Sequence, residues 1–190
     1  MGEEEQVGLP LTAVPLLVTD RLLLIPLTRR LMVKRLEQER FSTTEGSVEV
    51  IVGPEWPGDP FPAFPAWVAA LAADEDEVAE TYVAVTRDTG EAVGMLGAKG
   101  PPNADGEREI GYGINPSAWG RGYGTEAVGA LVARLLDQQA VRVVTALTAV
   151  DNPASQRVLE KLGFTRTGTT WNEEDGALIA WSRSGTRPAG

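Results

Sequence analysis

Residues 115–136, NPSAWGRGYGTEAVGALVARLL, place glycines at positions 120, 122 and 124 directly before an apolar segment with helical periodicity. Apolar residues recur at i, i+4 and i+8 through Ala127, Leu131 and Leu135, which predicts a helix over Thr125–Gln138. The first amides of a helix lack intrahelical partners and attract anions, and glycines let a phosphate approach the backbone. The stretch therefore predicts an anion-binding turn, although a glycine-rich turn that only reverses the chain has the same composition.

Two common nucleotide-binding motifs do not fit this turn. A P-loop needs a Gly-Lys pair followed by Ser or Thr, and the turn contains no Lys. Gly111 and Gly113 begin a G-x-G-x-x-G pattern, but Pro116 stands where the last glycine should be. The phosphate compound must be identified from other features.

The segments around the turn predict an α+β fold. Asn152 as N-cap, Pro153 as first residue and Gly163 as C-terminal stop define a second clear helix. Val141–Val150 is apolar on both faces, as a buried central strand is. The other predicted elements are strands over Leu22–Leu27, Thr81–Arg87, Glu91–Lys99, Glu107–Ile114, Thr165–Trp171 and Ala177–Arg183, and helices following Leu27 and over Ala66–Ala73.

Length and composition restrict the class of protein. A chain of 190 residues is expected to form one domain over 1–190, with residues 1–18 as a flexible or loosely packed extension. No apolar run could span a bilayer, and the N-terminus lacks a secretory signal, so we expect a soluble, cytoplasmic protein without a membrane partner. The net charge of −10 argues against nucleic acid and fits an amine or cationic partner.

The chain contains neither Cys nor His, which removes much of the usual catalytic chemistry. A Cys nucleophile, a Ser-His-Asp triad, a disulfide and a zinc site with N and S ligands are all excluded. We read the acidic run Asp74–Glu77 as a solvated helix end and expect no metal. Any general base must be a carboxylate, Tyr, Lys or water.

Three successive stretches resemble motifs of the GNAT superfamily of N-acetyltransferases: EIGYG, then INPSAWGRGYGTEA, then DNPASQRVLEKLGF. TDRLLLIPL near the start is similar to the branch that acetylates ribosomal-protein N-termini, and the resemblance covers about Thr19 to Phe164. It implies a mixed, mostly antiparallel sheet flanked by helices, with two splayed central strands. It also implies acetyl-CoA as the acyl donor.

The resemblance further implies where the donor binds. Its pyrophosphate would lie on the turn, its pantetheine would pair with the strand that ends at Ile114, and Asn152 would contact it as well as cap its helix. Trp119 departs from the Gln or Arg that usually opens the motif. The cofactor-binding residues implied in this way are Ile114, Trp119, Gly120, Arg121, Gly122, Tyr123, Gly124, Thr125 and Asn152.

Two residues are candidates for the proton transfers. Glu109 stands on a strand where the family often carries a carboxylate base, but it is equally a surface residue that pairs with Arg108 or a neighbour. Ser155 stands where this branch has a Ser near the thioester sulfur, but it could also act as a helix cap partner. Tyr112 and Tyr123 are alternative proton donors, and we expect Tyr123 to pack.

These features together predict an N-acetyltransferase that moves an acetyl group from acetyl-CoA to a primary amine by direct transfer in a ternary complex. A CoA-binding sensor or interaction module with weak or no catalysis is the alternative, and a homodimer is left open. The acceptor site is expected near the Pro-rich segment Gly53–Trp67. Its aromatic residues Trp56, Phe61, Phe64 and Trp67 either line an amine-binding cleft or pack the loop itself.

Overall fold

One eight-stranded sheet forms the centre of the computed structural model, which describes residues 14–71 and 77–185. The strand order is β1-β2-β5-β6-β7-β8-β10-β9, and β3 and β4 form a separate hairpin. The strands are β1 (Leu17–Val18), β2 (Leu22–Thr28), β3 (Phe41–Glu45), β4 (Val48–Val52), β5 (Glu77–Thr86), β6 (Ala92–Lys99), β7 (Glu107–Ile114), β8 (Val143–Ala149), β9 (Thr165–Asn172) and β10 (Gly176–Ser184). The helices are α1 (Arg29–Glu37), α2 (Phe64–Ala70), α3 (Tyr123–Leu136) and α4 (Pro153–Lys161), with short 3-10 turns η1 (Phe61–Ala63) and η2 (Pro116–Ala118).

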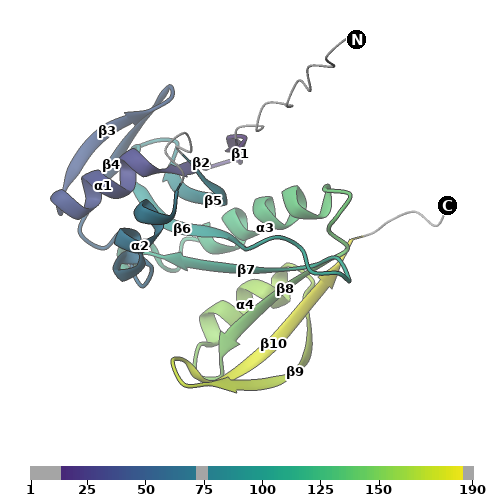
Figure 1. Cartoon of the computed structure of the whole chain (residues 1–190). Coiled ribbons are helices and arrows are strands. Elements are labelled where there is room, and N and C mark those ends of the chain that lie inside the picture. Colours follow the sequence, from purple (N-terminus) through teal and green to yellow (C-terminus); the bar gives the residue numbers. More distant parts are fainter. Residues whose placement is uncertain (1–13, 72–76, 186–190) are drawn as a thin grey trace, which may run out of the picture.

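Helices cover both faces of this sheet. α3 and α4 lie on one face, and α1, α2 and the β3–β4 hairpin lie on the other (Figure 1). β5 shows why the strands are so apolar: Tyr82 and Ala84 belong to the core under α3, while Val83 and Val85 belong to the core under α1 and α2. A strand buried on both faces needs apolar residues at every position. None of the helices in the described ranges is long and apolar enough to cross a bilayer.

The predicted splayed pair is confirmed at β7 and β8. These strands are the parallel neighbours of the sheet, and their register runs only from Glu107 opposite Val143 to Ile110 opposite Ala146. β8 continues to pair with β10 as far as Ala149, while β7 continues alone on that side as far as Ile114. The two strands therefore separate next to the glycine-rich turn and expose unpaired backbone edges.

Most predicted elements are confirmed, and the differences have local causes. α3 begins at Tyr123, two residues earlier than predicted, because Gly122 adopts φ 81° and serves as its N-cap. α2 begins at Phe64 instead of Ala66, since a proline is tolerated in the first turn of a helix. The β3–β4 hairpin was not predicted. Leu17 and Val18 pair with β2, so the expected N-terminal extension does not include them.

One expectation lies partly outside the described residues. The acidic run was read as a solvated helix end, and its positions 74–76 are not described. Its last residue, Glu77, begins β5 and pairs with Thr28 of β2. At that position the reading as a helix end is wrong.

Candidate active site

The glycine-rich turn carries a row of free backbone donors. Gly120 and Gly122 adopt φ 74° and 81°, a conformation that favours glycine. The N–H groups of residues 120–125 have no hydrogen-bond partner among the residues that the structure describes. A Cβ on Gly120 would meet nothing within 4 Å, so the approach to these donors is open. The turn has the form that a phosphate group requires.

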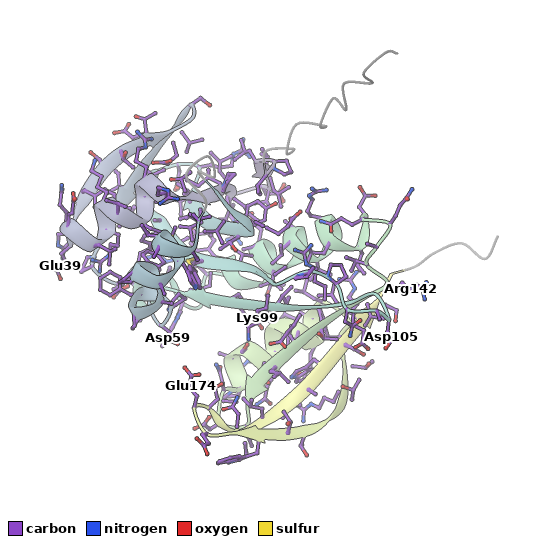
Figure 2. All side chains as sticks on the ribbon, viewed as in Figure 1. Glu39, Asp59, Lys99, Asp105, Arg142 and Glu174 are labelled. Carbon is purple, nitrogen blue, oxygen red and sulfur yellow. The ribbon has the colours of Figure 1, made fainter. Side chains whose placement is uncertain are left out.

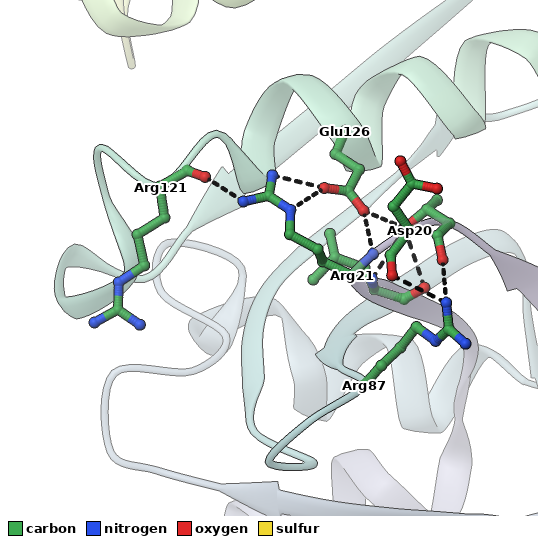
Figure 3. Close-up of polar contacts among 7 residues, drawn as sticks. Asp20, Arg21, Arg87, Arg121 and Glu126 are labelled. Atoms are coloured by element: carbon green, nitrogen blue, oxygen red, sulfur yellow. Dashed lines mark hydrogen bonds and ion pairs between the residues drawn. The ribbon is translucent and has the colours of Figure 1, made fainter.

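A network of contacts from the start of β2 fixes this turn (Figure 3). The Arg21 guanidinium donates to the Arg121 carbonyl at 2.7 Å through Nη1, and to Glu126 Oε2 at 2.7 Å through Nε. Glu126 Oε1 also accepts from the Arg21 backbone N–H at 2.7 Å and from Thr19 Oγ1 at 2.6 Å. The loop is thus held by residues about one hundred positions earlier in the chain.

Ionisation of Glu126 is favoured by this network. Burial opposes the charge, but hydrogen bonds from the Thr19 hydroxyl and from the Arg21 backbone and side chain, together with the Arg21 charge, outweigh it and lower the pKa of the Glu126 carboxyl. The Arg21 guanidinium also lies over the Tyr123 ring, 4.9 Å from its centre. Tyr123 is half-buried against the core, as expected. The Arg121 side chain is exposed and points away from Glu126.

A second group of residues lies across the separated strands. The Ser155 backbone N–H donates to Asn152 Oδ1 at 3.0 Å, which confirms Asn152 as the N-cap of α4. The Ser155 hydroxyl is therefore left for another role, and it shares a hydrogen bond of 2.6 Å with the Tyr112 hydroxyl. Burial raises the pKa of Tyr112 to about 12, against a smaller opposing effect of that hydrogen bond. Two residues that the sequence suggested separately thus form one hydroxyl pair.

Glu109 lies on β7 before the strands separate, opposite Thr145. Its Oε1 atom accepts from Lys99 Nζ at 2.7 Å, and its side chain is 33% exposed. Arg108, the other expected partner, is buried and instead donates to the Gly100 carbonyl and to Gln138. The structure therefore places Glu109 in an ion pair and does not bring it together with Ser155.

A cleft of about 1190 Å³ lies on the α2 face of the sheet. Its floor includes Gly97, Gly111 and Gly113 of β6 and β7, and a Cβ on Gly113 would meet nothing within 4 Å. Asp59 and Glu174 lie on opposite sides of it (Figure 2). The cleft reaches Ile114, so it adjoins the separated strands and the turn.

The aromatic residues of the Pro-rich segment divide between the two expected roles. Trp67 lines the cleft. Trp56 and Phe64 are fully buried and pack edge to face at 5.6 Å, and Phe61 packs on Phe64 at 6.1 Å. The segment is therefore mainly packed by its own aromatic rings. Trp119, which the sequence placed with the turn, also lines the cleft.

These geometric features agree with the comparison to known families. Residues 21–165 match a family model described as an acetyltransferase (GNAT) domain. The chain is a member of the GNAT family. As a GNAT acetyltransferase it is an acetyl-CoA-dependent acyltransferase.

Relatives of this acetyltransferase carry the same general description. The uncharacterized N-acetyltransferase YjdG of Bacillus subtilis (strain 168) is 37% identical over 112 residues, which cover 58% of this chain and 67% of YjdG. The uncharacterized N-acetyltransferase YoaA of the same strain is 33% identical over 82 residues, which cover 43% of this chain and only 46% of YoaA. The second match thus spans about half the length of its relative.

Solved structures share the fold of this GNAT acetyltransferase at low identity. A GNAT-family acetyltransferase from Bacillus anthracis has a TM-score of 0.65 at 16% identity and covers 90% of this chain and 98% of its own. RimL, a ribosomal L7/L12 alpha-N-protein acetyltransferase in complex with coenzyme A, has a TM-score of 0.61 at 16% identity, with coverages of 90% and 98%. AAC(6')-Ib in complex with ribostamycin and coenzyme A has a TM-score of 0.58 at 22% identity, with coverages of 87% and 94%.

Proposed function

We propose that this acetyltransferase moves the acetyl group of acetyl-CoA directly to a primary amine in a ternary complex. The observation that carries the proposal is the position of the Ser155–Tyr112 hydroxyl pair, which bridges α4 and the free end of β7 beside the open turn. A thioester lying between the separated strands would have its sulfur near these hydroxyls. With neither Cys nor His in the chain, the acetyl group has no obvious nucleophile to reside on before transfer.

The donor would be held by backbone groups for most of its length. The amides of Gly120–Thr125 would bind the diphosphate. The free edge of β7 before the Ile114 carbonyl, which accepts from Trp119 Nε1, would pair with the pantetheine amides. Asn152 uses one oxygen as a helix cap, so its amide N–H groups remain for a donor contact. Coenzyme A in the structures of RimL and AAC(6')-Ib supports the same class of donor for this fold.

The reaction requires two proton movements. The neutral amine attacks the thioester carbonyl carbon, a C–N bond forms, the C–S bond breaks, and the amine loses one proton. The departing thiolate gains a proton, which Ser155 would donate while Tyr112 supports its hydroxyl. At pH 7, deprotonating an α-amine costs about 1 kcal/mol and deprotonating a Lys amine about 4 to 5 kcal/mol. An α-amine thus needs less assistance from a base.

Glu109 is our proposed base, acting through water. Glu109 is not among the residues that line the cleft, and its Oε1 atom is engaged by Lys99, so a proton from an acceptor in the cleft would have to reach Oε2 through water. Replacement by Gln should then lower the rate most below the pKa of the acceptor, and the deficit should shrink toward pH 9 because hydroxide can replace the lost base. A deficit that is constant over that range would assign Glu109 to a positioning role.

Thiol release from acetyl-CoA over a panel of amines tests the whole proposal. The panel should include an N-terminal peptide and an aminoglycoside, because RimL and AAC(6')-Ib represent these acceptor classes. Release that depends on an amine supports the acetyltransferase. Binding of acetyl-CoA without release for any amine would instead favour the sensor module.

A further inference from the structure

Trp119 stands in the glycine-rich motif, and its side chain lines the cleft on the α2 face. Its indole Nε1 donates to the Ile114 carbonyl at 2.6 Å, which fixes the direction of the ring. The residue is 67% exposed. An indole that is held at one edge and open on its face is a suitable surface for a cation.

Glu55 lines the same cleft and is bound to the short loop that precedes Trp119. Its Oε2 atom accepts from the Ser117 backbone N–H at 3.0 Å and from Ser117 Oγ at 2.6 Å, two residues before Trp119. These two hydrogen bonds, first that of the hydroxyl and then that of the backbone, hold the pKa of the Glu55 carboxyl below its ordinary value. Its Oε1 atom has no hydrogen-bond partner within residues 14–71 and 77–185. The carboxylate is thus ionised, oriented and free to bind a further donor.

Carboxylates outnumber cations among the charged groups of the cleft lining. The described lining contains the carboxylates of Glu55, Asp59 and Glu174, and none of them has an ion-pair partner in the described part of the chain. The cations of that lining, Lys99 and Arg108, are already bound to Glu109 and to Gly100 and Gln138, respectively. A positive charge entering the cleft would therefore be stabilised.

We infer that Trp119 and Glu55 determine acceptor specificity by binding a second positive charge, so that the preferred acceptor is an amine that carries another cationic group. This inference rests on the proposed function, because it takes the cleft to be the acceptor site. It assigns Trp119 to the acceptor and not to the donor. The exposed indole face and the oriented carboxylate would enclose the charge from two sides.

Two amines of equal length test the inference. 1,4-Diaminobutane and n-pentylamine both present a primary amine on a chain of six heavy atoms, and only the first carries a second charge. Calorimetric titration of the enzyme saturated with coenzyme A measures their binding without requiring turnover. We expect the diamine to bind roughly tenfold more tightly, which is the combined scale of a cation–π contact with an exposed indole and an ion pair with an exposed carboxylate.

Variants assign this preference to the two residues. Trp119→Leu and Glu55→Gln should each reduce the preference at least about threefold, while the affinity for coenzyme A stays unchanged. Trp171→Leu is the matched control, because Trp171 is 66% exposed and lies outside the lining of the cleft. The control should keep the full preference, which should also decline as salt is added.

Three results would overturn the inference. The first is equal or undetectable binding of both amines by the wild type. The second is a Trp119→Leu variant that loses affinity for coenzyme A but keeps the preference, which would return Trp119 to the donor site. The third is a Trp171→Leu variant that loses as much preference as Trp119→Leu. The proposed function fails separately, because it requires only thiol release with some amine.

Discussion

Replacing Glu126 by Gln should destabilise the protein through the contacts that hold the glycine-rich turn. The carboxylate accepts two hydrogen bonds at Oε1 and, at Oε2, a hydrogen bond and an ion pair with the Arg21 guanidinium at 2.7 Å. The Glu126 side chain is only 16% exposed, but the Arg21 side chain is 50% exposed, so solvent weakens the ionic part. Gln keeps one acceptor oxygen and loses the charge, which gives a loss of about 2 kcal/mol. For a domain of this length, the melting temperature should fall by roughly 4 to 8 °C.

The pH dependence gives an independent check of the same contacts. The pKa of Glu126 is lowered in the folded state, so its contribution to stability is present above the unfolded pKa of about 4.3 and is lost as pH falls through the folded value. The difference in melting temperature between the wild type and the variant should be constant from about pH 6 to 8 and shrink below about pH 4.

Thermal unfolding with a surface control decides the outcome. Glu160 pairs with Arg166 at 3.0 Å, but both side chains are about half exposed, so Glu160→Gln should cost less than about 0.5 kcal/mol. The Glu126 variant should also bind acetyl-CoA more weakly, since Arg21 is no longer held in place to bind the Arg121 carbonyl. A Glu126→Gln loss no larger than that of Glu160→Gln, or one that persists unchanged at low pH, would refute the reasoning.

Further predictions concern the glycine-rich turn and the hydroxyl pair. Acetyl-CoA at a hundred times its dissociation constant should stabilise the wild type by about 2.7 kcal/mol. Gly122→Val should abolish this stabilisation, because a branched side chain at φ 81° disturbs the turn and approaches Arg21 Nη2. An unchanged thermal shift would show that the donor binds elsewhere. Ser155→Ala should lower kcat by about 10²-fold or more with little change in acetyl-CoA affinity, and a loss under about threefold removes Ser155 from the mechanism. Burial raises the pKa of Tyr112 to about 12, so Tyr112 stays protonated up to about pH 10. Up to that pH, the kcat of the wild type should show no decline that is absent from the Tyr112→Phe variant.

The features that could be predicted from the sequence are local ones. The helix caps at Asn152 and Gly163 and the apolar period of α3 each depend on neighbouring residues. β8 lies within the sheet as predicted, but it is not buried on both faces, because only alternate residues are buried and Leu147 is 37% exposed. The β3–β4 hairpin was missed because Phe41–Glu45 is mostly polar and its alternation is weak over five residues. The sequence left open whether the aromatic residues of the Pro-rich segment pack or line a cleft, because the complete burial of Trp56 depends on packing against distant residues.

Pairings across the fold could not be predicted in this way. Arg21 and Glu126 are 105 positions apart, and no sequence pattern around either residue indicates that they pair. Tyr112 and Ser155 were both suggested as proton donors, but their contact requires α4 to pack beside the free end of β7. The direction of Trp119 could not be predicted either, because its place in the motif pointed to the donor while its ring lines the cleft.

The proposed acceptor cleft draws in part on a different stretch of the chain from the proposed donor site. The open turn, Asn152 and Ser155 belong to the second half of the sequence, whereas Glu55, Asp59 and Trp67 belong to the segment before β5. If the proposed sites are correct, mutations in that earlier segment can alter the choice of amine while the acyl-donor site is inherited intact. In evolutionary terms, a lineage with this architecture can acquire new acceptors by a few changes in one connecting segment, without passing through variants that no longer bind acetyl-CoA.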